Sequence, residues 1–204
     1  MPTTSPTKKS DLMTGWQLLF EVVKVVVISL AIIIPVRAFL LQPFYVKGAS
    51  MEPNFEDREY LLIDEISYRI RDPKRGEVVV FRYPKDPSQF FIKRVIGLPG
   101  ESIHVADDRI VVNGRVLDES AYLASDVLTS GTVDLTLGQD EYMVFGDNRM
   151  ASLDSRIFGA VPRSDIVGKA WIRAWPFTRI SHFSAPVYLT QDPAASLLRA
   201  YATP

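Results

Sequence analysis

The distribution of apolar residues divides the chain into two parts with different periodicity. From Trp16 to Leu41 most residues are apolar, and the run from Val25 to Val36 contains no charge. A helix needs about 20 apolar residues to span a bilayer, so this stretch predicts a transmembrane helix if Glu21, Lys24 and Arg37 are accommodated near its ends. Glu21 and Lys24 are spaced i,i+3 and can pair on one helix face.

Two alternatives for this segment are a cleaved secretory signal peptide and a buried core helix. A signal peptide has a shorter apolar region and a small-residue cleavage site, whereas this segment is long and ends in Phe39, Leu40 and Leu41. An uncleaved anchor over residues 15–41 is therefore favoured. The basic residues of the 1–14 tail predict a cytoplasmic N-terminus, with the rest of the chain on the other side of the membrane.

Beyond Pro43 the pattern becomes strand-like, which predicts a mainly β domain over residues 42–180. Asn113-Gly114 is a strong hairpin signal, residues 118–138 are expected to form a loop-rich connection, and 181–204 a C-terminal tail with a weak helix signal at Ala194–Tyr201. The expected strands are Tyr60–Ile63, Glu77–Arg82, Gln89–Ile96, Ser102–Ala106, Arg109–Val112, Arg115–Leu117, Glu141–Phe145 and Ile166–Ala174.

Composition excludes several function classes. The net charge of −1 gives no support to nucleic-acid binding, and the absence of cysteine excludes disulfides and thiolate chemistry. The two histidines, His104 and His182, are far apart and lie outside any H-E-x-x-H motif, so we expect no catalytic metal.

Residues 44–53 form a small-residue turn that presents Ser50 where the apolar segment ends. Such residues also make ordinary turns, so Ser50 is a candidate nucleophile only if a base lies near it. The candidate base is Lys93, which strand alternation places on one face with Phe91 and Val95. Burial lowers the pKa of a lysine, and a neutral lysine can accept a serine proton. The alternative is a surface lysine whose stem lies along apolar side chains.

A Ser–His–Asp triad is a commoner arrangement in serine hydrolases, but the sequence favours it less. Glu52 stands where the nucleophile elbow G-x-S-x-G needs its second glycine. His104 lies in an expected strand and His182 in the weakly patterned tail, so both are expected to be structural or exposed to solvent.

Three further segments accompany the one around Ser50: Arg75–Pro84, Phe91–Gly100 and Gly146–Gly159. In this order and at these separations, the four segments resemble the sequence boxes of bacterial type I signal peptidases, also called leader peptidases, over about residues 15 to 180. The resemblance implies an antiparallel β catalytic domain with one N-terminal transmembrane helix. It also implies a serine endopeptidase that uses a Ser–Lys dyad, without a cofactor, to remove signal peptides from secreted preproteins after small residues of the Ala-x-Ala type.

The resemblance assigns Ser50 as the nucleophile, Lys93 as the general base and Ser152 as the hydroxyl that orients the lysine. Gly48 stands where many family members have a serine that helps to form the oxyanion hole, so the hole would rely on main-chain N–H groups, chiefly that of Ser50, with that of Gly48 or a neighbour as a second donor. Met150-Ala151 replaces a pair that is commonly polar. The residues expected to support the site are Gly48, Arg94, Asp147, Asp154 and Arg156, with Arg94 pairing with Asp147.

The resemblance further implies that the preprotein binds as an added β-strand. The candidates for the apolar walls of its pockets are Val46, Met51 and Phe91. Because residues 42–49 alone separate the apolar segment from Ser50, we expect the site to lie close to membrane lipid.

Two rival functions remain. A self-cleaving Ser–Lys repressor of related fold would be soluble and carry a DNA-binding domain, and the apolar segment argues against it. An inactive membrane-anchored β module would bind preproteins without cutting them, and the joint presence of Ser50, Lys93 and Ser152 argues against that.

Overall fold

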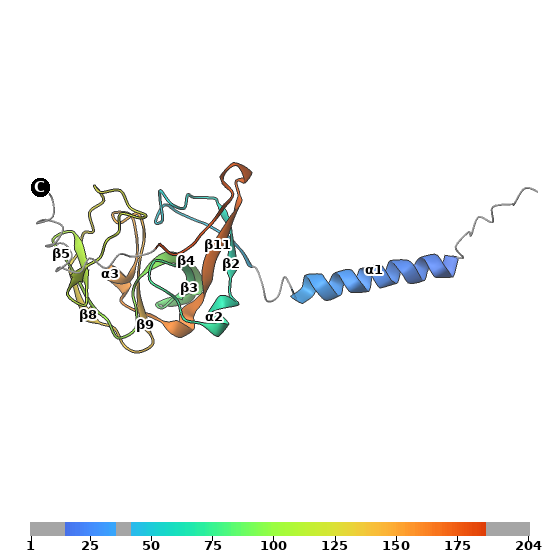
Figure 1. Cartoon of the computed structure of the whole chain (residues 1–204), viewed down its shortest axis with the longest axis horizontal. Coiled ribbons are helices and arrows are strands. Elements are labelled where there is room, and N and C mark those ends of the chain that lie inside the picture. Colours follow the sequence, from blue (N-terminus) through green and yellow to red (C-terminus); the bar gives the residue numbers. More distant parts are fainter. Residues whose placement is uncertain (1–14, 36–41, 187–204) are drawn as a thin grey trace, which may run out of the picture. The chain divides into compact units, whose positions relative to one another are not determined.

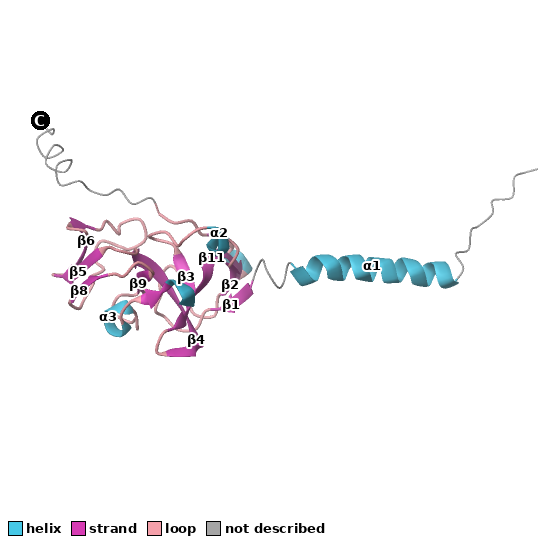
Figure 2. Ribbon diagram, turned by 90° about the horizontal axis from the view of Figure 1, so that it is seen from below, coloured by secondary structure: helices cyan, strands magenta, loops and turns pink. Residues whose placement is uncertain are grey.

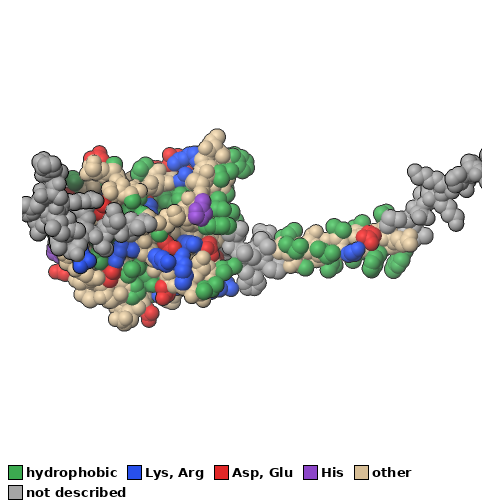
Figure 3. Space-filling model, in the orientation of Figure 1, with side chains coloured by type: hydrophobic (Ala, Val, Ile, Leu, Met, Phe, Trp, Pro, Cys, Tyr) green, Lys and Arg blue, Asp and Glu red, His purple; other side chains and the backbone are tan. Residues whose placement is uncertain are grey.

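The computed structural model describes residues 15–35 and 42–186. Contacts divide the chain into two units, Met1–Phe39 and Leu40–Pro204. In the first unit, helix α1 (Gly15–Pro35) contains a stretch that is long and apolar enough to cross a membrane, as predicted. Its visible surface is mostly hydrophobic (Figure 3), and Glu21 pairs with Lys24 at 3.5 Å. The predicted continuation of the helix to Leu41 falls on residues 36–41, which are not described, as does the 1–14 tail.

The second unit is built mainly from antiparallel strands (Figures 1 and 2), which confirms the predicted fold class. Its larger sheet has the order β1-β2-β11-β3-β4-β9-β10, with β12 beside β11. The bounds of these strands are β1 Gln42–Tyr45, β2 Tyr60–Asp64, β3 Val78–Tyr83, β4 Asp86–Gly97, β9 Glu141–Phe145, β10 Val161–Pro162, β11 Ile166–Trp175 and β12 Ser181–His182.

A smaller four-stranded sheet has the order β7-β6-β5-β8. The predicted hairpin at Asn113-Gly114 is present, and both residues have positive φ, as a tight turn of this kind requires. The bounds are β5 Ser102–Ala106, β6 Arg109–Val112, β7 Arg115–Val116 and β8 Val133–Thr136. The short helical turns are α2 Ser67–Ile70, α3 Ser155–Phe158, η2 Arg163–Asp165 and η3 Phe177–Arg179.

Strand β8 lies inside the 118–138 segment, so the prediction of a loop was wrong at that point. Val133 and Leu135 alternate with polar residues and pack against the core of the smaller sheet, while β8 pairs with β5. The apolar contact comes from the neighbouring sheet, and four residues are too few to give a clear period in the sequence.

The C-terminal part of the domain also differs from the expected tail. Ser181 and His182 form β12 and pair with β11, and Phe183 packs against the core beside Phe55 at a ring distance of 4.4 Å. The domain therefore continues past residue 180. The weak helix signal at 194–201 falls outside the described residues.

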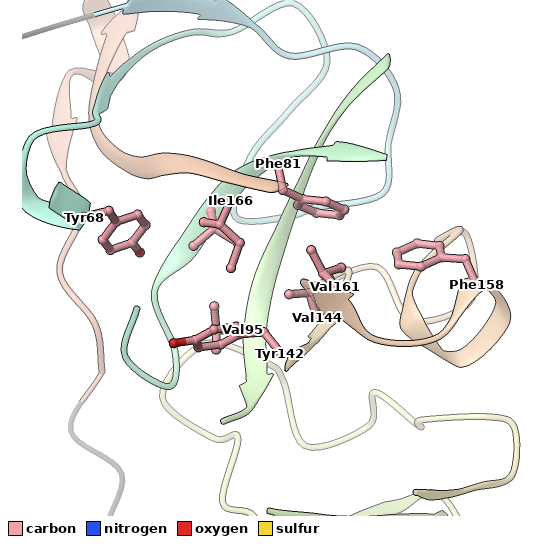
Figure 4. Close-up of a cluster of buried hydrophobic side chains, with 9 residues drawn as sticks. Tyr68, Phe81, Val95, Tyr142, Val144, Phe158, Val161 and Ile166 are labelled. Carbon is pink, nitrogen blue, oxygen red and sulfur yellow. The ribbon is translucent and has the colours of Figure 1, made fainter. Parts of the chain in front are cut away.

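Three buried apolar clusters hold the domain together. The cluster in Figure 4 joins strands β3, β4 and β9 to α2, α3, β10 and β11. A second cluster lies under the turn after β1, and a third fills the space between β4, β9 and the smaller sheet. Strand β4 contributes to all three clusters, so its central residues are fixed from several sides.

Strand β1 brings the turn that contains Ser50 close to β4. The Phe44 ring of β1 lies edge-on to the Phe90 ring of β4, with centroids 5.6 Å apart. Strand β4 pairs with β3, where Lys93 is opposite Val79. The two candidate catalytic segments, 43 residues apart, thus meet across the end of the sheet.

Candidate active site

The structure brings Ser50 and Lys93 into direct contact. Ser50 lies in the turn after β1, and Lys93 lies near the middle of β4. Lys93 Nζ is 2.7 Å from Ser50 Oγ and 2.8 Å from the carbonyl oxygen of Ile92. The second contact holds the amine in place, so the lysine reaches the serine with a defined geometry.

Lys93 is buried, with 4% of its surface exposed. Val95 belongs to the same core cluster that Phe91 packs against, so the strand alternation predicted from the sequence is present. Burial lowers the pKa of Lys93 from 10.5 to about 8, while the negative charges of Asp154 and Asp147 act in the opposite direction. With this pKa, about a tenth of the amine is neutral at pH 7.

The turn after β9 contacts the Ser50 turn from the side opposite Lys93. The Asn148 amide N–H donates to the Ser50 carbonyl oxygen at 3.1 Å, and its side chain donates to the Ala49 carbonyl oxygen at 3.1 Å. A methyl group on Gly146 would lie 2.2 Å from Ser152 Oγ and 2.4 Å from the Ser50 carbonyl oxygen. Glycine is required at position 146 because the turn that contains Ser50 and the turn after β9 touch there.

Arg94 and Asp147 form the ion pair expected from the sequence. Arg94 Nε and Nη2 donate to the two carboxylate oxygens of Asp147 at 2.8 and 2.6 Å, and both side chains are buried. Arg94 also donates to the Gly76 carbonyl oxygen, and the Asn54 side chain donates to Asp147. The pair fixes the turn after β9 relative to β4, next to Lys93.

Asp154 and Arg156 support the other end of the same turn. The Asp154 carboxylate caps α3 and accepts hydrogen bonds from the Arg156 side chain, at 2.8 Å, and from the Gly146 amide, at 3.0 Å. Burial alone would raise the pKa of Asp154, but these hydrogen bonds outweigh it and lower the pKa. Asp154 therefore stays negatively charged beside the site.

The hydroxyl oxygen of Ser152 is buried near Ser50, but the contact expected with Lys93 is not formed in this structure. Among the described residues its hydroxyl has no hydrogen-bond partner, although it lies near enough to Asp154 to help lower the pKa of that carboxyl group. The hydroxyl oxygen lies beside Gly146, where it would clash with a methyl group on that residue.

Gly48 supports the turn with its backbone. Its φ of +92° is a conformation that glycine adopts readily, and its amide N–H donates to Asp57 Oδ1 at 2.7 Å. This N–H is therefore engaged and is not a free donor for an oxyanion. Within the part of the chain that the structure describes, the amides of Ala49 and Ser50 donate no hydrogen bond.

A groove of about 420 Å³ runs beside the dyad. Val46 and Phe91 line it, as expected, but Met51 does not: its side chain is buried in the core cluster under the turn, where it packs with Phe55. The prediction for Met51 was wrong because residues 50–55 form a tight turn, which directs this side chain inward. The groove residues that the sequence did not suggest are Phe44, Val80, Phe90, Ile92, Ala151 and Leu153.

Arg149 is a further residue near the site that sequence reasoning did not single out. Its side chain is fully buried, donates to the Gly146 carbonyl oxygen at 3.0 Å and pairs with Glu119. Arg149 stands inside the Gly146–Gly159 segment, but Glu119 lies in the unpatterned 118–138 connection, so no local signal linked the two.

Neither histidine lies at the dyad. His104 is next to Asp134 on the smaller sheet, and His182 lies against Trp171 on β11. Over residues 15–35 and 42–186, no group of three or more histidine or acidic side chains is arranged to hold a metal ion.

Comparison with known proteins identifies the family. The family model described as "Signal peptidase, peptidase S26" matches residues 19–175. A probable signal peptidase I-2 of Synechocystis sp. is 39% identical over 182 residues, covering 87% of this chain and 81% of its own. Signal peptidase IB of Staphylococcus aureus is 31% identical, covering 80% of this chain and 93% of its own. A crystal structure of a signal peptidase I from Enterococcus faecalis is 31% identical and covers 48% of this chain and 97% of its own, with a TM-score of 0.42. The family-model match runs from within α1 through the β domain and includes the segments that hold Ser50 and Lys93, and the chain belongs to the signal peptidase family, peptidase S26.

Proposed function

We propose that this signal peptidase is a membrane-anchored serine endopeptidase in which Ser50 is the nucleophile and Lys93 the general base. The observation that carries the proposal is the 2.7 Å contact between Ser50 Oγ and the amine of a lysine that is 4% exposed. A buried lysine with a pKa of about 8 is a suitable base near neutral pH.

In the proposed reaction, neutral Lys93 accepts the Ser50 hydroxyl proton while Oγ bonds to the carbonyl carbon of the scissile peptide. The tetrahedral intermediate collapses when the Lys93 ammonium returns this proton to the leaving amine nitrogen and the C–N bond breaks. Lys93 then takes a proton from water as the water oxygen attacks the ester carbonyl carbon. The C–Oγ bond breaks, the Lys93 ammonium returns the proton to Ser50 Oγ, and the signal peptide leaves as a carboxylic acid that ionises in water. The free Ser50 amide is the candidate donor to the developing oxyanion.

The substrate is proposed to be a preprotein whose signal peptide adds as a strand along β4. Among the described residues, β9 pairs with β4 at Arg94, Val95 and Gly97, so β9 does not cover the β4 edge over residues 89–92. The groove beside this edge is lined mainly by apolar side chains, including Val46, Phe91 and Leu153. A shallow apolar groove of this kind suits small residues at the first and third positions before the cut.

The test is cleavage of a preprotein with an Ala-x-Ala boundary by the full-length protein in detergent or lipid, with the cut position read by mass spectrometry. We expect wild type to cut after the second alanine and Ser50→Ala to lose all cleavage while keeping its circular dichroism spectrum. Ser164→Ala, at an exposed serine, is the matched control and should cut normally. Undiminished cleavage by Ser50→Ala, or none by wild type in several lipids, would contradict the proposal.

We also propose that the N-terminus is cytoplasmic and the β domain lies on the opposite side of the membrane. The support is the apolar helix α1 together with Lys8 and Lys9 in the preceding tail. Protease added to intact spheroplasts should digest the β domain. Complete protection before lysis, followed by digestion after it, would refute this orientation.

A further inference from the structure

The segment between β7 and β8 carries a carboxylate, that of Glu119, which is bound to the turn after β9. This turn, residues 146–154, is the catalytic turn. Glu119 accepts a hydrogen bond from Arg149 Nη1 at 2.8 Å and one from Arg149 Nη2. The Arg149 side chain is 0% exposed and that of Glu119 is 15% exposed. Within the described part of the chain, Glu119 is the carboxylate that forms an ion pair with Arg149.

Arg149 connects Glu119 to the turn after β9. Its Nε donates to the Gly146 carbonyl oxygen at 3.0 Å, and its own carbonyl oxygen accepts a hydrogen bond from Arg156 at 2.7 Å. Gly146 is also the residue that touches the Ser50 carbonyl oxygen so closely that a methyl group would not fit. A displacement of Arg149 would therefore move Gly146 and, through it, the backbone of Ser50.

A second connection runs from Glu119 through Tyr122. The Tyr122 hydroxyl donates to Glu119, and its ring lies over the guanidinium of Arg94, 4.1 Å from the centroid. Arg94 holds both carboxylate oxygens of Asp147. The Asn54 amide group joins the Tyr122 carbonyl oxygen to Asp147, at 2.8 and 2.9 Å. Through Tyr122, Glu119 is thus linked to both Arg94 and Asn54, which hold Asp147.

We propose that Glu119 is a positioning residue of the active site, which fixes the catalytic turn and balances the buried charge of Arg149 behind Lys93. It touches neither the dyad nor the groove, and it acts through Arg149 and Tyr122. The inference rests on the proposed function in one respect, because it takes Lys93 as the general base.

The charges around Lys93 give the proposal a signature that loss of packing would not produce. The charged groups near it are Asp147 and Asp154, each paired with an arginine, and the Glu119–Arg149 pair lies behind the same turn. Arg149 is permanently protonated, so removing the Glu119 charge leaves this buried positive charge without its ion-pair partner, with the carboxylate of Asp147 already paired with Arg94. That charge disfavours protonated Lys93. Removing Arg149 instead leaves an unbalanced negative charge, with the opposite effect.

The experiment compares the pH dependence of kcat/KM for the full-length protein and its variants. We expect the acid limb of Glu119→Gln to move to lower pH, and that of Arg149→Gln to move to higher pH. Each shift should be roughly half a pH unit, the effect of one charge over a distance on the order of 20 Å at an effective dielectric constant of about 20. The double variant should return close to the wild-type limb, and kcat of Glu119→Gln should fall at least tenfold through misplacement of the turn.

The matched control is Glu101→Gln. Glu101 also has a side chain that is 15% exposed and is paired with an arginine, Arg75, but it has no contact with the catalytic turn. It should lower thermal stability and leave the acid limb in place. An unchanged limb in Glu119→Gln, or an equal shift in Glu101→Gln, would overturn the proposal.

A readout without cleavage separates this inference from the proposed function. The titration of Lys93 can be followed by the carbon chemical shift of labelled lysine side chains, assigned by loss of one signal in Lys93→Arg. The same opposite shifts are expected for Glu119→Gln and Arg149→Gln even if no preprotein is cut. If Glu119→Gln does not fold, the titration pH of Lys93 cannot be compared between the two single variants, but Arg149→Gln and the double variant still test the proposal. A Lys93 signal that titrates at the wild-type pH in Arg149→Gln refutes it.

Discussion

Replacing Lys93 with methionine removes a buried amine whose charged form is disfavoured in the folded protein. The pKa of Lys93 falls from 10.5 to about 8 on burial, a difference of about 2.5, which corresponds to about 3 kcal/mol of destabilisation whenever the lysine is protonated. Methionine also loses the contacts with Ser50 Oγ and with the Ile92 carbonyl oxygen, worth about 1 kcal/mol each. We therefore expect Lys93→Met to be more stable than wild type by about 1 kcal/mol at pH 7.

The sign of the pH dependence distinguishes this cause from simple repacking. Between pH 8 and 10.5 the unfolded chain binds more protons at Lys93 than the folded chain does, so wild-type stability rises through this window relative to the variant. Below pH 8 the penalty is present in full. The advantage of Lys93→Met should therefore be constant from pH 6 to 7 and disappear as the pH approaches 10.

The assay is urea unfolding of both full-length proteins in the same detergent at pH 6.5, 8.5 and 10, followed by the fluorescence of Trp171 and Trp175 in β11. Ser50→Ala is the control, because it removes the same hydrogen bond but keeps the amine. It should show no pH-dependent gain. A difference between Lys93→Met and wild type that stays the same at all three pH values would refute the reasoning.

Three other changes have defined outcomes. Lys93→Arg keeps a charge that cannot be removed at working pH, so we expect cleavage to fall by several orders of magnitude in a folded protein. The kcat/KM of wild type should rise with pH to a limb near 8. Near-normal turnover by Lys93→Arg would contradict the proposed dyad. Gly146→Ala forces a methyl group against the Ser50 carbonyl oxygen, so a melting experiment should show about 1–3 kcal/mol of lost stability, and an unchanged melt would contradict the close approach. Asp147→Asn removes the buried carboxylate that pairs with Arg94 and should cost about 3–5 kcal/mol by the same measurement. Asp72→Asn, which affects an exposed carboxylate paired with Arg163, should cost about 1 kcal/mol or less.

The parts of the molecule that the sequence predicted are those with a local signal. The apolar run over α1, the alternation along β4 and the Asn113-Gly114 hairpin each depend on neighbouring residues, and all are present. The contact between Ser50 and Lys93 spans 43 residues, and it was expected from the order of the four segments rather than from any period.

The features that the sequence missed depend on contacts with distant parts of the chain. Met51 was a candidate for the apolar wall of the groove, but the direction of a side chain in a turn is set by the core beneath it. The engagement of the Gly48 amide depends on Asp57, in the loop before β2. Strand β8 is recognisable only beside β5, since its four residues carry too little pattern alone.

The buried ion pairs around the catalytic turn are better explained by position than by stability. A buried pair contributes little net stability, because burial of both charges offsets most of their attraction. Each arginine of these pairs nevertheless also donates to a carbonyl oxygen: Arg94 to Gly76, Arg149 to Gly146, and Arg156 to Ser130 and Arg149. Apolar packing is not directional, so it cannot specify the orientation of a peptide group, whereas a guanidinium held by a carboxylate can. The network fixes Gly146 against the backbone of Ser50, and a nucleophile that must meet a lysine at 2.7 Å needs that restraint.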